Sequence, residues 1–291
     1  MKKLYGTGVA LITPFTENLE VDYKALKKIL SHTAKGADYY VVMGTTGEAA
    51  TVSDDEKQEI LQFVKNNNTA RLPIVFGIGG NNTQHEREQI KATDLRGVDA
   101  ILSVSPYYSK PSQEGIYQHF KSIADTSPVP VVLYNIPGRT SSNLTAETTV
   151  RLAAHKNIVG IKEASGNLEQ CMKIVRDAPK DFLMVSGDDM MTVALYAIGS
   201  RGVISVLANS FPGIFRKMKD HSFGGSYPKA SAELYKLLDI NPAMYEEANP
   251  VGVKYLMSLM GLCQPFVRLP LVQASEGLKK RIEKLYSQIK K

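Results

Sequence analysis

Ile158-Val-Gly-Ile-Lys-Glu-Ala-Ser165 is the stretch from which the fold can be worked out. It opens with a short apolar run rich in isoleucine and valine, which predicts a buried β-strand over Ile158–Lys162. Lys162 lies inside that strand, and removing an ammonium group from water is costly. A neutral lysine amine attacks carbonyl carbons. Lys162 is therefore either a catalytic nucleophile or an edge-strand lysine whose ammonium group reaches solvent.

Seven similar runs accompany this one, and helical patterns separate them. The other predicted strands are Gly8–Thr13, Tyr39–Met43, Pro73–Ile78, Ala100–Ser105, Val129–Asn135, Phe182–Ser186 and Gly202–Leu207. The predicted helices are Tyr23–Ala34, Asp54–Asn66, Thr83–Arg96, Gln113–Asp125, Ala146–Ala154, Leu168–Asp177 and Met190–Ile198. Strands that are apolar on both faces and alternate with helices predict a covered parallel sheet. Eight such units within about 210 residues fit a closed (β/α)8 barrel.

The main alternative fold is an open doubly wound sheet. It is disfavoured because the best candidate for its glycine motif, Gly77-Ile-Gly-Gly-Asn-Asn82, lacks the last glycine. Beyond Pro212 only helical patterns follow, at Phe211–Phe223, Lys229–Asp239, Asn249–Leu262 and Glu276–Lys290. We therefore expect a catalytic barrel over residues 1–224 and a C-terminal helical domain over residues 225–291.

The composition is that of an ordinary globular protein, with 291 residues, 43% hydrophobic and 22% charged. Of the net charge of +6, the segment Lys279–Lys291 carries +5, so no distributed basic face for nucleic acid is expected. Cys171 and Cys263 are predicted to be core residues of a protein in a reducing compartment and not to form a disulfide. The apolar N-terminal run is short and broken by Thr13 and Pro14, which argues against a signal peptide. We expect a cytoplasmic protein without membrane spans.

In a barrel of this kind, the catalytic and binding residues lie at the carboxyl ends of the strands. The second strand ends in Gly44-Thr45-Thr46-Gly47-Glu48, whose backbone N–H groups and hydroxyls suit a carboxylate, although a plain glycine turn is the simpler interpretation. The fourth strand delivers Tyr107 and Tyr108, and the fifth Tyr134. Tyrosines at such positions are more often packing residues than acids.

Two further positions widen the candidate site. Arg139 follows the fifth strand and could bind a carboxylate with two hydrogen bonds or form a surface ion pair. The seventh strand ends in Ser186-Gly187-Asp188-Asp189, which raises the possibility of a metal. No carboxylate–histidine cluster with ligand spacing is present, so we expect no metal and interpret Asp188 as a helix cap. Together the strand ends predict a site for an α-keto acid whose ketone meets Lys162.

These residues, in this order, resemble the dihydrodipicolinate synthase family, within the N-acetylneuraminate lyase superfamily of Schiff-base aldolases. The resemblance runs from Gly6-Thr-Gly-Val-Ala-Leu-Ile-Thr-Pro-Phe15 to Asn249-Pro-Val and Leu269-Pro, nearly the whole chain. Gly44–Glu48 and Gly160-Ile-Lys-Glu163 mark the superfamily. Pro106-Tyr-Tyr108 together with Tyr134-Asn-Ile-Pro-Gly-Arg-Thr140 is typical of the synthases.

The resemblance implies that Lys162 forms a Schiff base with pyruvate and that the resulting enamine attacks L-aspartate 4-semialdehyde, the committed step of diaminopimelate and lysine biosynthesis. No cofactor or metal is implied. Tyr134, Thr45 and Tyr108 would relay protons, with Tyr108 reaching in from a neighbouring subunit of a homotetramer built as a dimer of dimers. The substrate-binding residues it implies are Thr46, Arg139, Gly187 and Ile204.

One group of positions departs from the family pattern. Lysine-inhibited members carry a serine and two histidines where this chain has Ala49, Asp54 and Lys57, and a glutamate where it has His85. Asn81 and Tyr107 match the pattern. Because Lys57 would repel a cationic effector, we expect weak or absent inhibition by lysine.

Three other functions are less consistent with these residues. A sister aldolase that cleaves N-acetylneuraminate or a 2-keto-3-deoxy sugar acid would use the same lysine, but Arg139 suits a short semialdehyde better than a polyol. A non-catalytic keto-acid sensor would not need the nucleophile and its hydroxyl relay. A phosphate-binding, metal-dependent barrel aldolase would need histidine ligands.

Overall fold

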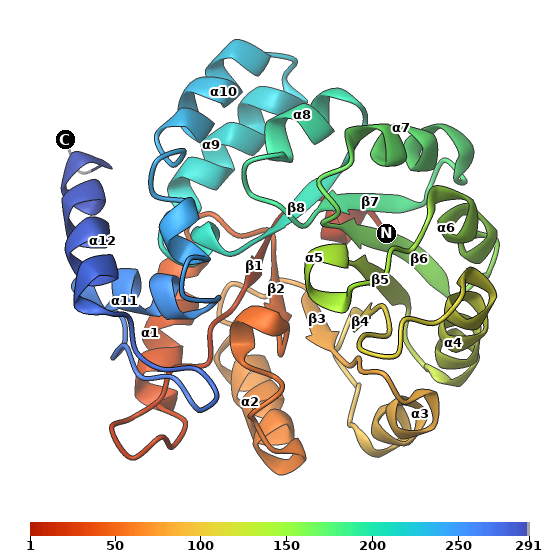
Figure 1. Ribbon diagram of the computed structural model, residues 1–291, viewed down its shortest axis with the longest axis horizontal. Coiled ribbons are helices and arrows are strands. Elements are labelled where there is room, and N and C mark those ends of the chain that lie inside the picture. The colour runs from red at the N-terminus through yellow and green to blue at the C-terminus, as the bar shows by residue number, and fades with distance from the viewer. Residues whose placement is uncertain (290–291) are drawn as a thin grey trace. The chain divides into compact units, whose positions relative to one another are not determined.

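The computed structural model describes residues 1–289, and within that range eight parallel strands form one closed barrel (Figure 1). Strands that are neighbours in the sequence are also neighbours in the barrel, so the predicted (β/α)8 architecture is confirmed. Most strands are buried along their whole length, as parallel strands covered on both faces must be. The strands are β1 (Gly6–Ala10), β2 (Tyr39–Val42), β3 (Ile74–Gly77), β4 (Ala100–Val104), β5 (Val131–Asn135), β6 (Ile158–Glu163), β7 (Leu183–Ser186) and β8 (Gly202–Ser205).

The helices that follow the strands lie close to their predicted positions. They are α1 (Tyr23–Thr33), α2 (Asp54–Asn67), α3 (Thr83–Ala92), α4 (Gln113–Thr126), α6 (Ala146–Ala153), α7 (Leu168–Asp177) and α8 (Thr192–Ala197). Helix α3 stops four residues earlier than predicted, because Thr93 adopts an extended backbone and its hydroxyl donates to the Gln89 carbonyl at 2.7 Å. Helix α8 begins two residues later than predicted.

The C-terminal helices are α9 (Pro212–Phe223), α10 (Tyr227–Tyr235), α11 (Val251–Leu259) and α12 (Glu276–Ile289). Lys290, the last residue of the predicted fourth helix, lies outside the described residues. Short segments without a clear sequence signal complete the described chain: η1 (Lys2–Leu4), η2 (Thr45–Gly47), α5 (Pro137–Thr140), η3 (Leu207–Asn209) and η4 (Pro242–Met244).

The chain divides into two compact units whose boundaries differ from those of the predicted domains. The first unit comprises Met1–Gly6 and Pro73–Ile204, and the second comprises Thr7–Leu72 and the chain from Ser205 onward. The prediction of a separate helical domain over residues 225–291 stays a prediction, since the structure groups those helices with α1, β2 and α2. Figure 1 shows α3, α4, α6 and α7 in a row along the outside of the first unit's strands.

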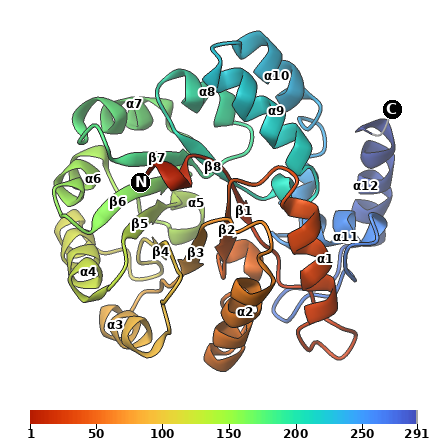
Figure 2. The same ribbon diagram turned by 180° about the vertical axis from the view of Figure 1, so that it is seen from behind.

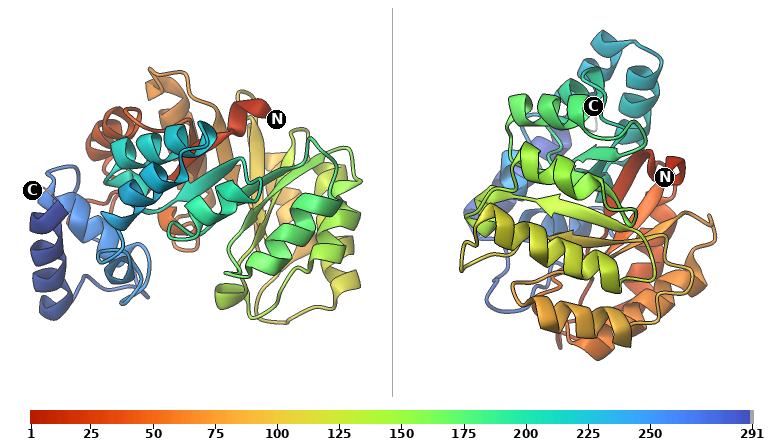
Figure 3. Two further views of the ribbon diagram at one scale, coloured as in Figure 1. Left: turned by 90° about the horizontal axis from the view of Figure 1, so that it is seen from above. Right: turned by 90° about the vertical axis from the view of Figure 1, so that its right-hand side faces the viewer.

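Each unit is held together by contacts of its own. In the first, the Gly6 N–H donates to the Arg201 carbonyl oxygen at 2.8 Å, which places the N-terminal segment beside β8, as Figure 2 shows. In the second, α9 and α10 pack side by side (Figure 3). Among residues 1–289, no helix combines the length and the apolar character needed to cross a membrane.

Candidate active site

Lys162 and Tyr134 lie side by side near the carboxyl ends of β6 and β5. The two strands pair in parallel with Tyr134 opposite Lys162, and the Lys162 Nζ lies 4.1 Å from the centre of the Tyr134 ring. Lys162 is only 7% exposed. Within residues 1–289 its ammonium group forms no ion pair with a carboxylate. A buried amine that no carboxylate holds is free to react with a carbonyl carbon.

Gly187, directly after β7, gives the Lys162 side chain its space. A Cβ atom at position 187 would lie 2.6 Å from the Cβ of Ala164 and 3.0 Å from the Cε of Lys162. The first of these contacts is shorter than packed carbon atoms allow. Any side chain at position 187 would therefore displace Lys162 or the loop after β6.

A buried polar network holds the strand that carries Lys162. Because successive strand residues point to opposite faces, Glu163 faces away from Lys162. Its two carboxylate oxygens accept hydrogen bonds from Asn135 at 3.2 and 3.1 Å, from Gln170 at 2.9 Å and from the Ser165 N–H at 2.7 Å. The network ties β5, β6 and α7 together. Sequence reasoning missed it, and its only signal was a second charged residue directly after Lys162.

The Gly44-Thr-Thr-Gly-Glu48 segment folds as a 3-10 turn between β2 and α2. Met43 and Glu48 have φ angles of 59° and 54°. This left-handed conformation costs a residue other than glycine roughly 1–3 kcal/mol and persists only where the surroundings enforce it. One of the enforcing contacts is the Thr13 hydroxyl, which donates to the Gly47 carbonyl oxygen at 2.6 Å.

Three residues from the C-terminal part of the chain also hold this loop. The Asn249 side-chain amide donates to the Thr46 hydroxyl oxygen at 3.0 Å. Lys254 donates from its Nζ to one carboxylate oxygen of Glu48, and the Arg268 backbone N–H donates to the other at 3.0 Å. Lys254 and Glu48 form an ion pair that is almost completely buried.

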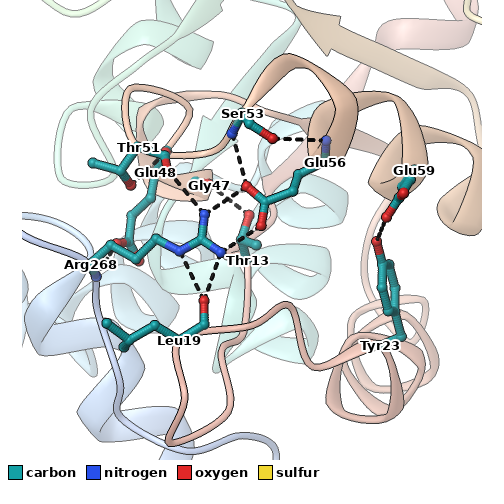
Figure 4. A network of polar contacts seen from close by, with 10 residues as sticks. All are labelled: Thr13, Leu19, Tyr23, Gly47, Glu48, Thr51, Ser53, Glu56, Glu59 and Arg268. Atoms are coloured by element: carbon teal, nitrogen blue, oxygen red, sulfur yellow. Dashed lines mark hydrogen bonds and ion pairs between the residues drawn. The ribbon is translucent and has the colours of Figure 1, made fainter.

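The Arg268 side chain fastens the segment that follows the loop, as Figure 4 shows. Its guanidinium group donates to both carboxylate oxygens of Glu56, at 2.7 and 2.6 Å, and to the backbone carbonyls of Leu19 and Thr51. It also stacks on the Phe15 ring at 4.4 Å. These hydrogen bonds lower the pKa of Glu56 to about 2. No local sequence pattern indicates this cluster, because its members are far apart along the chain.

The remaining predicted substrate and relay residues have contrasting surroundings. Tyr108 is 89% exposed and has a φ of 73°. Arg139 is exposed on the short helix α5, whereas Ile204 is buried in β8. Thr45 is exposed at the start of the 3-10 turn. A tyrosine so fully exposed makes few contacts within its own chain.

The residues predicted to surround an effector lie on helices α2 and α3 and in the loops after η2, β3 and β4. Asp54 and Lys57, in the first turn of α2, form an ion pair of 2.9 Å. The Asn81 side chain donates to the Tyr107 carbonyl oxygen at 3.4 Å. The other two positions are the half-buried Ala49 and the exposed His85.

Asp188, the first of the two aspartates after β7, acts on the backbone. Asp188 accepts hydrogen bonds from the N–H groups of Met190 at 2.8 Å and Met191 at 3.4 Å. The predicted cap therefore acts on the turn that leads into α8, whose N-cap residue is Met191 itself. Among the described residues, no three His, Cys, Asp or Glu side chains are grouped so that they could hold a metal ion.

A second buried titratable cluster lies outside this site. Glu86 on α3 accepts a hydrogen bond from the Ser103 hydroxyl at 3.0 Å, and its other oxygen lies 3.4 Å from the His119 Nε2. Burial raises the pKa of Glu86 to about 8 and lowers the pKa of His119 to about 4. At neutral pH the contact therefore joins two uncharged groups and is not an ion pair.

Comparison with known proteins identifies relatives along the whole chain. The model of the Dihydrodipicolinate synthetase family matches residues 3–289. The 4-hydroxy-tetrahydrodipicolinate synthase of Cytophaga hutchinsonii is 48% identical over 290 residues, covering 99% of this chain and 98% of the relative. The protein of the same name from Flavobacterium psychrophilum is 47% identical over 293 residues, covering 100% of both.

Solved structures of dihydrodipicolinate synthases are also similar to this chain over nearly its whole length. The chloride-inhibited dihydrodipicolinate synthase from Acinetobacter baumannii, complexed with pyruvate, has a TM-score of 0.95 to this chain at 35% identity and covers 99% of both chains. A monomeric dihydrodipicolinate synthase variant has a TM-score of 0.93 at 35% identity, over 99% of this chain and 97% of the other. The similarity thus includes every strand of the barrel and the C-terminal helices.

Proposed function

The chain belongs to the dihydrodipicolinate synthetase family, and we propose that it is a lyase that condenses pyruvate with L-aspartate 4-semialdehyde. This reaction is the committed step of diaminopimelate and lysine biosynthesis. The observation that carries the proposal is the buried Lys162 beside Tyr134, in a side-chain space that Gly187 keeps open. Such an amine is the group that a Schiff-base aldolase requires.

In the proposed mechanism, the Lys162 amine adds to the ketone carbon of pyruvate, and water leaves to give a protonated Schiff base. The cationic nitrogen withdraws electrons, so the methyl group loses a proton and an enamine forms. The enamine carbon attacks the aldehyde carbon of the semialdehyde and forms the new carbon–carbon bond. Water, or the amino group that the condensed semialdehyde carries, then adds to the Schiff-base carbon and displaces the Lys162 amine, which is free for the next cycle.

These steps need protons to be moved close to Lys162, and Tyr134 is the adjacent hydroxyl-bearing side chain. A single phenol group is a weak acid and a scarce base at neutral pH, so a relay of hydroxyl groups suits the chemistry better than one group acting alone. We propose that Tyr134, Thr45 and Tyr108 form this relay.

The two substrates each carry a carboxylate. We propose that the Gly44–Glu48 loop, through Thr46 and its backbone N–H groups, holds the carboxylate of pyruvate. Arg139, exposed on α5, would bind the carboxylate of the semialdehyde with its forked N–H donors. Backbone groups of Gly187 and Ile204 would complete the binding surface.

The proposed relay needs a second subunit. Tyr108 is almost fully exposed in a left-handed backbone conformation, which supports a role in a neighbouring protomer's site. We therefore propose a homotetramer built as a dimer of dimers, with Tyr108 crossing the tighter interface. A monomeric variant exists among the similar structures, so the assembly needs direct measurement.

The positions predicted to surround an effector also bear on regulation by lysine. Asp54 and Lys57 neutralise each other where lysine-inhibited relatives bind the cationic effector, so we propose weak or absent feedback by lysine. Turnover measured with rising lysine checks this, and strong inhibition below millimolar lysine would refute it.

Cys171 and Cys263 are free and buried, which favours a reducing compartment such as the cytoplasm.

The proposed activity is tested by incubating the protein with pyruvate and aspartate semialdehyde and identifying the product by mass. We expect condensation of the two substrates and no cleavage of N-acetylneuraminate or of a 2-keto-3-deoxy sugar acid. Cleavage of either sugar acid without any condensation would assign the chain to a sister aldolase. Binding of pyruvate without turnover of any of these substrates would indicate a sensor.

A further inference from the structure

The loop proposed to hold the pyruvate carboxylate is itself held by residues more than 200 positions away along the chain. We propose that Asn249 and Lys254 are positioning residues for keto-acid recognition, which set the geometry of this loop without touching the substrate. The inference rests on the proposed function of the Gly44–Glu48 loop. It gives the C-terminal helical segment a part in substrate affinity.

Asn249 determines which way the Thr46 hydroxyl can donate. The Asn249 amide N–H uses the Thr46 oxygen as an acceptor at 3.0 Å, and both side chains are buried. A hydroxyl has one hydrogen to donate, and here that hydrogen is left for another acceptor. An N–H donor on the oxygen also polarises the O–H bond and strengthens its donation. Thr46 is thereby prepared to donate to a carboxylate.

Lys254 fixes the other end of the loop and balances its charge. Its side chain is fully buried and donates from Nζ to Glu48 and to the Phe266 carbonyl oxygen, the latter at 2.8 Å. The ammonium group also lies 4.1 Å from the centre of the Phe15 ring. Without Lys254, the buried Glu48 carboxylate at the end of the loop would lose its ion-pair partner and would repel an anionic substrate.

The backbone of the loop explains why it needs such support. Met43 and Glu48 both adopt the left-handed conformation, so the loop relaxes unless side chains enforce it. Asn249 acts at the middle of the loop and Lys254 at its end. The two contacts are therefore expected to change affinity for the keto acid more than the rate of the chemical steps.

The charge pair is tested with two variants, Lys254→Met and the double variant Glu48→Gln/Lys254→Met, which leaves no lone charge buried. The readout is the pyruvate concentration that half-saturates the borohydride-trapped adduct on Lys162, together with KM for each substrate. We expect the pyruvate KM to rise on the order of tenfold in the double variant and further in Lys254→Met, with kcat and the aldehyde KM nearly unchanged.

The matched control is Lys219→Met. Lys219 also comes from a C-terminal helix, α9, and forms an ion pair with Asp38 at 2.8 Å, ahead of β2 and away from the loop. We expect this control to leave the pyruvate KM at its original value. An unchanged pyruvate KM in the folded double variant, or an equal rise in the control, would overturn the role of Lys254.

Asn249 is tested by a double-mutant cycle with Thr46→Val. If Asn249 acts through the Thr46 hydroxyl, Asn249→Ala should raise the half-saturating pyruvate concentration roughly fivefold in the original chain and less than about twofold in the Thr46→Val background. Additive effects would contradict the inference. The cycle also decides the case if the charge-pair variants do not fold. Absence of any adduct in the unmodified protein would instead contradict the proposed function.

Discussion

Lys162 and Lys254 are both buried lysines in apolar elements, and their partners distinguish their roles. Lys254 is fully buried, more so than Lys162, yet it is committed to Glu48 and the Phe266 carbonyl. Lys162 has an aromatic ring beside it and no carboxylate partner among the described residues. Burial alone therefore does not identify a nucleophile.

The sequence could predict Lys162 but not Lys254, although the same argument applied to both. A lysine in a short strand run is unusual, whereas Lys254 lies in the predicted helix Asn249–Leu262, where a lysine is ordinary. Its partner Glu48 lies 206 positions away, and no local pattern predicts such a contact. For the same reason, Asn249 was noted only as part of a family motif.

At the residue scale, the first prediction concerns the Tyr134 hydroxyl. In Tyr134→Phe the ring beside Lys162 is retained, so the fold and the Schiff base should survive while proton relay is lost. We expect kcat to fall by roughly 10²-fold or more, the usual contribution of general acid–base catalysis. Steady-state kinetics and a thermal melt measure the two effects. Near-normal turnover in the variant would remove Tyr134 from the mechanism.

At the element scale, the alternation of strands and helices was predictable because each βα unit carries its own local signals. Ser53 and Ser112, a residue type favoured at N-cap positions, accept hydrogen bonds from the first turns of α2 and α4, and Ser53 forms a complete capping box with Glu56. The 3-10 turn η2 and the short helix α5 were not predictable, since they span only three and four residues. Both carry proposed site residues, so the geometry of the site was less predictable than the barrel.

A pH prediction follows from the cluster that joins α3, β4 and α4. Burial raises the pKa of Glu86 from about 4.3 in an unfolded chain to about 8, so the folded state binds this proton more tightly than the unfolded state. Stability due to Glu86 therefore falls as pH rises across that window. His119, whose pKa is lowered to about 4, has the opposite effect, but only below about pH 6.5.

Between pH 6.5 and 8, Glu86 should therefore lower the free energy of unfolding as the pH rises, without the opposing contribution of His119. We expect Glu86→Gln to flatten the decline in unfolding free energy over this interval, measured by urea denaturation at several pH values. Glu88→Gln is the control, because Glu88 lies on the same helix and is exposed. Equal slopes in the two variants would show that Glu86 is not the titrating group.

At the scale of the whole molecule, the chain resembles its relatives over its full length, but the assembly depends on surfaces that a sequence does not reveal. If Tyr107 and Tyr108 were both extended, they would point to opposite sides and could not both serve one pocket within one subunit. In the structure Tyr108 has a positive φ and is exposed, so the pair is not simply extended. This exposed conformation of Tyr108 supports its proposed crossing into a partner's site.

The test is complementation between two weakly active variants, Lys162→Ala and Tyr108→Phe. In a mixed dimer, the protomer with an intact Lys162 receives an intact Tyr108 from its partner. Co-expression should therefore restore about a quarter of the original activity, the statistical share for random pairing in a two-fold symmetric dimer. No recovery, with dimers verified by native mass spectrometry, would place Tyr108 outside the partner's site.

Borohydride trapping is the direct test of Lys162 as the nucleophile. The protein is incubated with pyruvate, reduced with borohydride and mapped by peptide mass spectrometry. We predict one pyruvate-sized adduct, located on Lys162 and absent from Lys162→Arg. An adduct on another lysine such as Lys254, or no adduct at all, would contradict the account and leave Lys162 as a buried structural residue.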